Sequence, residues 1–203
     1  MNTRNRNLLV AVGLVVAIAA VLAVLINRGS DQGDASNQTA QGSPRITGES
    51  LAAYDRGTRD GAIDRQAPEV RGVDFNGRSV AIVNDGRPKV IVFLAHWCPH
   101  CQAEVPWVQA WVASGAKPDG VDLYAVPTWI DSGRPNYPPE TWLEREGWSS
   151  PVLVDSNDAV ADAYGVRGVP FWVFMRSDGT VALRLSGGIS EQELTHISEA
   201  LLR

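Results

Sequence analysis

Both cysteines of this chain follow directly after a segment whose composition is typical of a fully buried strand. Residues 88–95 have the sequence PKVIVFLA, an apolar run rich in β-branched residues. Cys98 and Cys101 come next in AHWCPHCQAE, at a spacing that two randomly placed cysteines would show about once in a hundred chains. Metal binding, a structural disulfide and redox exchange are the three chemical reasons for such a pair, and each makes different demands on the fold.

Strand and helix signals alternate along residues 62–203, the range expected to form the folded domain. Strands are expected as a hairpin within 67–83 turning at Asn76-Gly77, single strands at 121–129 and 151–155, and a hairpin within 170–187 turning at Asp178-Gly179. Helices are expected from about Pro99, within 134–147, within 156–165, and from a capping box of Ser190 and Glu193. This alternation predicts an α/β fold with an N-terminal β-hairpin and a mixed central sheet flanked by helices. Active groups of such sheets lie where strands end, and Cys98 follows a strand end.

The first 61 residues differ in character from this domain. Residues 8–26 are 19 consecutive apolar or glycine residues, which as a helix would span roughly 28 Å, enough to cross a membrane. Arg4 and Arg6 precede this run, so residues 1–7 are expected in the cytoplasm and the domain outside, in the bacterial envelope. A cleaved signal peptide is the main alternative to this single-pass anchor, and a buried core helix is another. Residues 27–61 are polar and predict a flexible linker.

Charge and compartment narrow the possible functions. The net charge is −5 and no basic stripe is present, so nucleic acid is not expected as a partner. An anchor and a signal peptide both export the domain to a compartment that permits disulfides. A disulfide between Cys98 and Cys101 would close almost no loop, and it would therefore add little as a structural staple.

The expected helix start gives the two cysteines different chemistry. Pro99 suits the first helical position, because its missing N–H would have no partner inside the helix. The free N–H groups and positive partial charge of the helix start stabilise a thiolate at Cys98. Cys101 lies one turn later on the same face, where it can attack a mixed disulfide formed at Cys98. We therefore expect an exposed nucleophile, Cys98, and a sheltered resolving thiol, Cys101.

Two motifs carry a resemblance to a known family. Trp97-Cys98-Pro99-His100-Cys101 after a buried strand resembles the active site of the thioredoxin-fold oxidoreductases, and Val169-Pro170 before a strand resembles their cis-proline. The resemblance covers about residues 62–203 and implies a thioredoxin-like fold. It also implies that the loop at Val169 and Pro170 packs against the cysteines and that its backbone binds the substrate chain.

Within that family the chain is most similar to the membrane-tethered TlpA/ResA-like group, whose signature is C-x-x-C-x-x-E-x-P. Glu104 matches the buried glutamate of that group, and it lies one turn beyond Cys101, where it can accept a proton from that thiol. Val92 stands where thioredoxin has a buried acid. The Pro99-His100 dipeptide and Val169 instead resemble the DsbA-like oxidases. This favours an oxidising or isomerising role over a reducing one.

The resulting hypothesis is an extracytoplasmic thiol–disulfide oxidoreductase that acts on protein thiols or disulfides and has a membrane redox partner. No organic cofactor and no resident metal are expected. One alternative is a copper-binding metallochaperone module on the same fold, using the cysteines and a histidine. Another is a redox-inactive binding domain. A zinc site needs four ligands, whereas His96 and His196 are expected at the surface.

Overall fold

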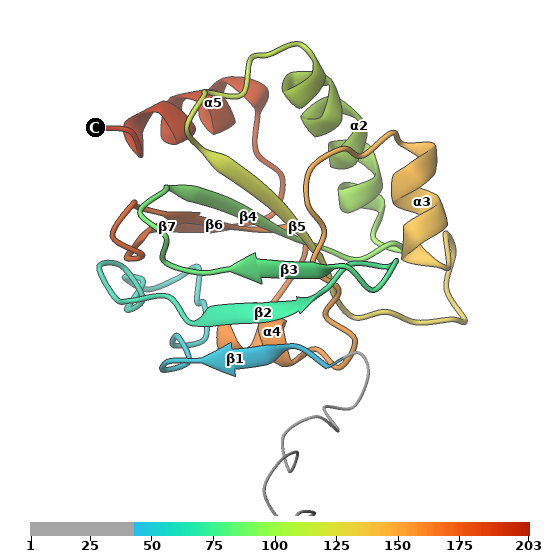
Figure 1. The fold of residues 1–203 in the computed structure, drawn as a ribbon, viewed down its shortest axis with the longest axis horizontal. Coiled ribbons are helices and arrows are strands. Elements are labelled where there is room, and N and C mark those ends of the chain that lie inside the picture. The colour runs from blue at the N-terminus through green and yellow to red at the C-terminus, as the bar shows by residue number, and fades with distance from the viewer. Residues whose placement is uncertain (1–42) are drawn as a thin grey trace, which may run out of the picture. The chain divides into compact units, whose positions relative to one another are not determined.

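The computed structural model describes residues 43–203, and the strand that leads to the cysteines lies inside its larger sheet (Figure 1). The four strands of this sheet are ordered β5 (Asp122–Pro127), β4 (Lys89–Leu94), β6 (Phe171–Met175) and β7 (Val181–Ser186). β4 is parallel to β5 and antiparallel to β6, and β6 is antiparallel to β7. Every residue of β4 is buried. The predicted central strand and mixed sheet are confirmed.

A second sheet of three strands contains the predicted N-terminal hairpin. Its order is β1 (Arg45–Thr47), β2 (Glu69–Val73) and β3 (Ser79–Ile82), all antiparallel. Gly77, in the turn between β2 and β3, has a φ of 74°, a conformation that glycine adopts without steric cost.

The folded part begins before residue 62, the boundary expected from composition. β1 pairs with β2, and the backbone N–H groups of Leu51 and Tyr54 donate to the carbonyl oxygens of Ala163 and Gly165 at 2.8 and 2.9 Å. Residues 43–61 therefore pack on the domain, because tertiary hydrogen bonds hold a segment whose composition is polar. The predicted membrane segment, residues 8–26, lies outside the described residues. Among residues 43–203, no helix combines the length and the apolar character that crossing a membrane requires.

Alternate residues of β4 face two apolar cores. Ile91 and Phe93 belong to one core, together with residues of β2, β3 and the short helix α4 (Ala159–Ala163). Val90, Val92 and Leu94 belong to the other core. That second core is completed by α2 (Pro99–Ala113), α3 (Pro139–Arg145) and α5 (Glu191–Ala200), and Figure 1 shows α2 and α5 near each other. The helices therefore flank the sheet as predicted, and the capping box of Ser190 and Glu193 is present at the start of α5.

The predicted strand at residues 151–155 is present only as a short parallel pairing with β5. Val152 forms an isolated bridge to Ala125, and the N–H groups of Leu153 and Asp155 donate to the carbonyl oxygens of Ala125 and Pro127. On the other side of the segment, the N–H of Val154 donates to Val73 of β2. The segment therefore lies along β5, but it adds no further strand to the four-stranded sheet.

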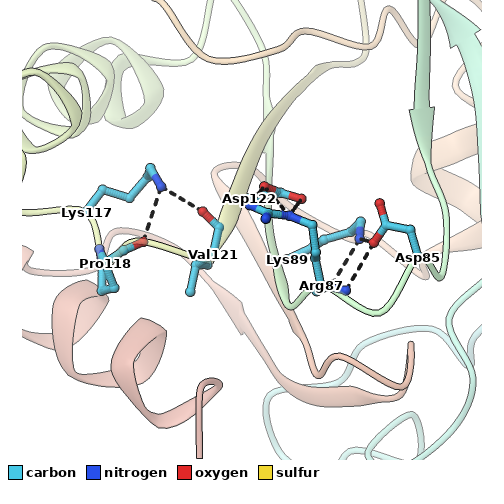
Figure 2. Close-up of polar contacts among 7 residues, drawn as sticks. All are labelled: Asp85, Arg87, Lys89, Lys117, Pro118, Val121 and Asp122. Atoms are coloured by element: carbon cyan, nitrogen blue, oxygen red, sulfur yellow. Dashed lines mark hydrogen bonds and ion pairs between the residues drawn. The ribbon is translucent and has the colours of Figure 1, made fainter.

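The start of β4, at the end of the strand opposite the cysteines, carries buried charge. Lys89 is 1% exposed, and its ammonium donates to Asp85 and, at 3.0 Å, to the carbonyl oxygen of Arg87 (Figure 2). The hydrogen bond from Lys89 holds the pKa of Asp85 below its ordinary value. Arg87 in turn binds Asp122 of β5 through two nitrogens. The charges at this end of the sheet are therefore neutralised by structural partners.

Candidate active site

The end of β4 places Cys98 at the start of α2. The backbone N–H of Cys98 donates to Ala95 at 3.0 Å, and the carbonyl oxygen of Cys98 accepts from Gln102 at 3.0 Å. Cys98 is the N-cap residue and Pro99 is the first residue of the helix. The Cys98 side chain makes no capping hydrogen bond to the helix. The Cys98 thiol therefore lies at the positive end of the helix, and it is not engaged in a capping hydrogen bond.

The two cysteines are free thiols of different accessibility. Cys98 is 6% exposed and Cys101 is fully buried at 0%. The order of exposure agrees with the assigned roles, but Cys98 is far less exposed than the sequence suggested, because the loop at Val169 packs over it. Burial raises the pKa of the Cys101 thiol well above its ordinary value. A backbone hydrogen bond from Ala95 opposes this rise, while Cys98 and Glu104 add to it.

The loop before β6 contacts Cys98. The Val169–Pro170 peptide bond is cis, as the family resemblance implied. The Cys98 thiol donates to the carbonyl oxygen of Val169 at 3.4 Å, so these two residues from distant parts of the sequence meet at the site. The carbonyl oxygen of Pro170 accepts from the N–H of Gly187 at 2.8 Å, which ties the loop to the end of β7.

Glu104 lies beneath the cysteines and is 4% exposed. Its Oε1 atom accepts from the backbone N–H of Ile189 at 2.9 Å, whereas Oε2 has no hydrogen-bond partner. Burial raises the pKa of Glu104 to about 7, although the Ile189 N–H and the indole of Trp172 act to lower it. The Trp172 indole N–H makes no hydrogen bond of normal distance and angle. Glu104 is thus a buried carboxyl group that exchanges its proton near neutral pH.

His96 is a site residue that the sequence argument placed wrongly at the surface. It is 1% exposed, its Nδ1 atom lies 2.7 Å from the carbonyl oxygen of Pro135, and its Nε2 atom accepts from the N–H of Asp131 at 3.2 Å. The long segment between β5 and α3 covers it. Proline and glycine in SGRPNYPP indicated a loop there, but nothing local indicated where the loop would fold.

The other predicted support residues flank the motif. Trp97 is half-buried, and its indole N–H donates to the carbonyl oxygen of Trp129 at 2.9 Å. Pro99 and His100 are exposed at the first turn of α2. His196 lies on the surface of α5, as expected.

The side chains around the cysteines were compared with what a metal site requires. Among residues 43–203, no cluster of three or more His, Cys, Asp or Glu side chains could hold a metal ion. A copper site built from the two cysteines would need a histidine. Both ring nitrogens of His96 face backbone groups, and His100, exposed on the first turn of α2, forms no such cluster with the cysteines. The arrangement instead offers one thiol, Cys98, that keeps a small exposed area, a second thiol, Cys101, that is fully buried, and a buried carboxyl group, Glu104, and this combination suits thiol–disulfide exchange.

Comparison with known proteins agrees with this chemistry. Residues 61–184 match the sequence profile of the AhpC/TSA family. Thiol-disulfide oxidoreductase ResA of Halalkalibacterium halodurans is 26% identical over 129 residues, which cover 63% of this chain and 70% of ResA. Soluble secreted antigen MPT53 of Mycobacterium bovis is 29% identical over 114 residues, covering 56% of this chain and 60% of the antigen. A thiol:disulfide interchange protein of the thioredoxin family from Chlorobium tepidum has a TM-score of 0.56 at 22% identity, covering 71% of this chain and 100% of that structure, and it confirms the thioredoxin-like fold.

Proposed function

The chain belongs to the AhpC/TSA family, and from this premise we propose that it is a thiol–disulfide oxidoreductase acting on protein substrates through Cys98 and Cys101. One observation carries the proposal. The Cys98 thiol lies at the N-terminus of α2 against the Val169 carbonyl, while Cys101, one turn later, is sealed from solvent. This arrangement lets a substrate sulfur reach one cysteine only, so the second cysteine is reserved for resolving the mixed disulfide.

In the oxidising direction the reaction begins with the Cys98–Cys101 disulfide. A substrate thiolate attacks the Cys98 sulfur, the Cys98–Cys101 bond breaks, and Cys101 leaves with the electron pair and takes up a proton. A second substrate thiolate then attacks the substrate sulfur of the mixed disulfide and releases Cys98 as a thiolate. The substrate loses two electrons and gains a disulfide. When the Cys98 thiolate takes up a proton from solvent, the protein is left with two free thiols, as in this structure.

Glu104 is proposed as the proton acceptor and donor for Cys101. The thiol of Cys101 has a raised pKa, so it leaves or attacks efficiently only if a nearby group manages its proton. Glu104 has a pKa of about 7 and is a buried residue of the same helix, α2. It can therefore hold a proton at one stage of the cycle and give it up at another without large cost near neutral pH.

Val169 and Pro170 are proposed to orient the substrate chain. The Val169 carbonyl already accepts from the Cys98 thiol, so the backbone of this loop is within reach of any chain whose sulfur bonds to Cys98. Backbone groups bind an extended peptide regardless of its side chains, which suits an enzyme with several protein substrates.

The direction is proposed to be oxidation or isomerisation. The helix N-terminus favours the Cys98 thiolate and thereby the reduced form, which makes the disulfide a stronger oxidant. A negative Glu104 opposes this, but with a pKa of about 7 it is largely neutral below that pH. We expect a reduction potential above the value of about −270 mV that thioredoxin has. Equilibration with glutathione buffers measures it, and a potential at or below that value would reverse the assignment to a reductant.

Residues 8–26 are proposed to anchor the domain on the outer side of a bacterial membrane, where a membrane redox partner would reoxidise it. The apolar run and its flanking arginines support the anchor. The relative MPT53, a soluble secreted antigen, supports export of the domain and not its anchoring. Carbonate-washed membranes should retain the full-length protein. Recovery of a shortened soluble form would show a cleaved signal peptide instead.

The decisive test of the function is trapping. Replacing the resolving thiol in Cys101→Ser should leave mixed disulfides on Cys98, and mass spectrometry of the trapped species in cells identifies the partner proteins. Cys98→Ser serves as the matched control and should trap nothing. If Cys98 of the reduced protein does not react with a thiol probe and Cys101→Ser traps no partner, the domain is a redox-inactive binding module.

A further inference from the structure

The segment between β5 and α3, residues 129–138 and here named the covering loop, lies against the cysteine motif. Trp97 donates to the carbonyl oxygen of Trp129 at 2.9 Å, and the guanidinium of Arg134 lies 4.8 Å from the centre of the Trp97 ring. The amide of Asn136 donates to the carbonyl oxygen of His96 at 3.3 Å. The covering loop is therefore joined to the two residues that immediately precede Cys98.

Both ring nitrogens of His96 make hydrogen bonds to the backbone of the covering loop. Nδ1 faces the carbonyl oxygen of Pro135 at 2.7 Å, so Nδ1 carries the proton. Nε2 accepts from the N–H of Asp131 at 3.2 Å, so Nε2 carries none. These partners assign a neutral imidazole with a defined tautomer. The two bonds reach two points of the covering loop, four residues apart, and they fix its conformation over the motif.

The entrance of the covering loop has an unusual backbone. Trp129 has a φ of 51°, which is rare for a bulky aromatic residue. Its N–H donates to the carboxylate of Asp158 at 2.7 Å, and its carbonyl oxygen accepts from Trp97. Such conformations persist only where surrounding contacts hold them, and they concentrate at functional sites.

Tyr137, at the end of the covering loop next to α3, has an exposed aromatic side chain. Tyr137 is 51% exposed and, with Leu202, is one of two large hydrophobic residues exposed within residues 43–203. Its ring packs edge-on against His96 at 5.9 Å between centroids. An exposed tyrosine on a fixed support is the kind of residue that anchors a protein partner, because it offers apolar area with little entropy to lose.

We propose that the covering loop is the recognition surface for polypeptide substrates, with Tyr137 contacting an apolar side chain near the substrate cysteine and His96 acting as a positioning residue. This rests on the proposed function. A polypeptide long enough to lie on Pro170 while its sulfur is bound to Cys98 extends beyond the motif, whereas a small disulfide such as oxidised glutathione reaches only Cys98. The covering loop therefore discriminates between protein disulfides and small disulfides.

The test compares two disulfide substrates of the reduced full-length chain, insulin and oxidised glutathione, with dithiothreitol present to regenerate the Cys98–Cys101 dithiol after each turnover and its uncatalysed rate subtracted. Tyr137→Ala and His96→Phe should each lower the ratio of kcat/KM for insulin to that for glutathione about tenfold, mainly through KM for insulin. His96→Gln should recover most of the ratio, because an amide supplies one donor and one acceptor. The double variant should be no worse than the more affected single variant, since both residues act through one loop. Leu202→Ala is the matched control, an exposed apolar residue near the C-terminus, and should leave the ratio unchanged.

An unchanged ratio in Tyr137→Ala, or an equal fall with both substrates, would overturn the inference. If His96→Phe does not fold, Tyr137→Ala still decides, because its side chain is exposed. A wild-type chain that neither reduces these disulfides nor, starting from its Cys98–Cys101 disulfide, oxidises reduced insulin or glutathione would instead remove the proposed function itself.

Discussion

The backbone N–H of Ile189 donates a 2.9 Å hydrogen bond to Oε1 of Glu104, and it thereby joins the segment before α5 to the helix that carries both cysteines. This is the one hydrogen bond that the carboxyl group receives, since Oε2 is buried without a partner. A single donor does not outweigh burial, and the pKa of Glu104 is consequently raised to about 7.

Glu104→Gln should remove a pH-dependent step from exchange. If Glu104 takes the proton of Cys101, resolution of the mixed disulfide should accelerate as pH rises through about 7, where Glu104 ionises. The variant should lose this acceleration and be about a hundredfold slower at pH 8, the range in which a general base contributes. Stopped-flow measurement between pH 5 and 9 gives both profiles. Profiles of identical shape would exclude Glu104 from proton transfer.

The same group should make the reduced protein less stable as pH rises. The pKa of Glu104 is about 7 when folded and 4.5 ordinarily, so the folded state holds its proton more tightly. The resulting stabilisation is complete below about pH 4.5 and is lost as pH rises through about 7, a change of up to about 3 kcal/mol. Urea unfolding of Glu104→Gln should show a flatter profile, with the difference from wild type moving in favour of the variant at higher pH. The exposed Glu199→Gln is the control, and a wild-type profile that parallels Glu104→Gln would contradict the prediction.

The ion pair of Arg184 and Asp60 should be a main support of the N-terminal segment. Arg184 is 2% exposed, and it binds Asp60 as well as the carbonyl oxygens of Ala52 and Tyr164 at 3.0 and 2.7 Å. Burial acts to raise the pKa of Asp60, but the hydrogen bond and the charge of Arg184, together with the backbone N–H of Ala62, outweigh it and the pKa is lowered. The contribution of the pair is therefore present above pH 3.8, the ordinary pKa of Asp60, and lost as pH falls through its lowered pKa.

Arg184→Met should lower the free energy of unfolding at pH 7 by about 3 kcal/mol, because it leaves a partly buried carboxylate and two carbonyl groups without their donor. Chemical denaturation measures this loss. Arg65→Met removes the exposed pair with Glu49 and should change stability little. If the two variants lose the same free energy of unfolding, the buried pair of Arg184 and Asp60 contributes no more to stability than the exposed pair of Arg65 and Glu49.

Two glycines of nearly the same backbone conformation should tolerate alanine very differently. Gly165 has a φ of +69° and Gly147 a φ of +70°, yet a Cβ at Gly165 would lie 2.3 Å from the oxygen of Ala52, whereas one at Gly147 would meet nothing within 4 Å. Gly147→Ala should therefore lower the free energy of unfolding by only about 1 kcal/mol, the cost of placing a residue with a Cβ at a positive φ. Gly165→Ala should cost clearly more, since it must displace the backbone at Ala52. Thermal unfolding of both variants tests this, and similar midpoints would contradict it.

The sequence predicted correctly those helices and strands whose formation depends on residues that are neighbours in the chain. The apolar run at residues 88–95 contains β4, Pro99 begins α2, and Ser190 and Glu193 cap α5, because burial pattern, missing N–H and side-chain cap are properties of neighbouring residues. The strand expected at 151–155 is reduced to one bridge, between Val152 and Ala125 of β5. How far the segment pairs with β5 depends on a strand that is distant in the sequence, which its own apolar residues do not indicate.

The sequence by itself determined the chemistry of this protein: a pair of cysteines at a helix start after a buried strand, with Glu104 one turn later and Val169-Pro170 before a strand. These features depend on residue type and on spacing along the chain, which a sequence contains in full. Only the tertiary structure decided that Val169 contacts Cys98, that Ile189 donates to Glu104 and that His96 is buried beneath the covering loop. Those contacts join residues tens of positions apart, and they depend on how the loops close over the strand ends, where desolvation and the few available hydrogen bonds set each group's protonation.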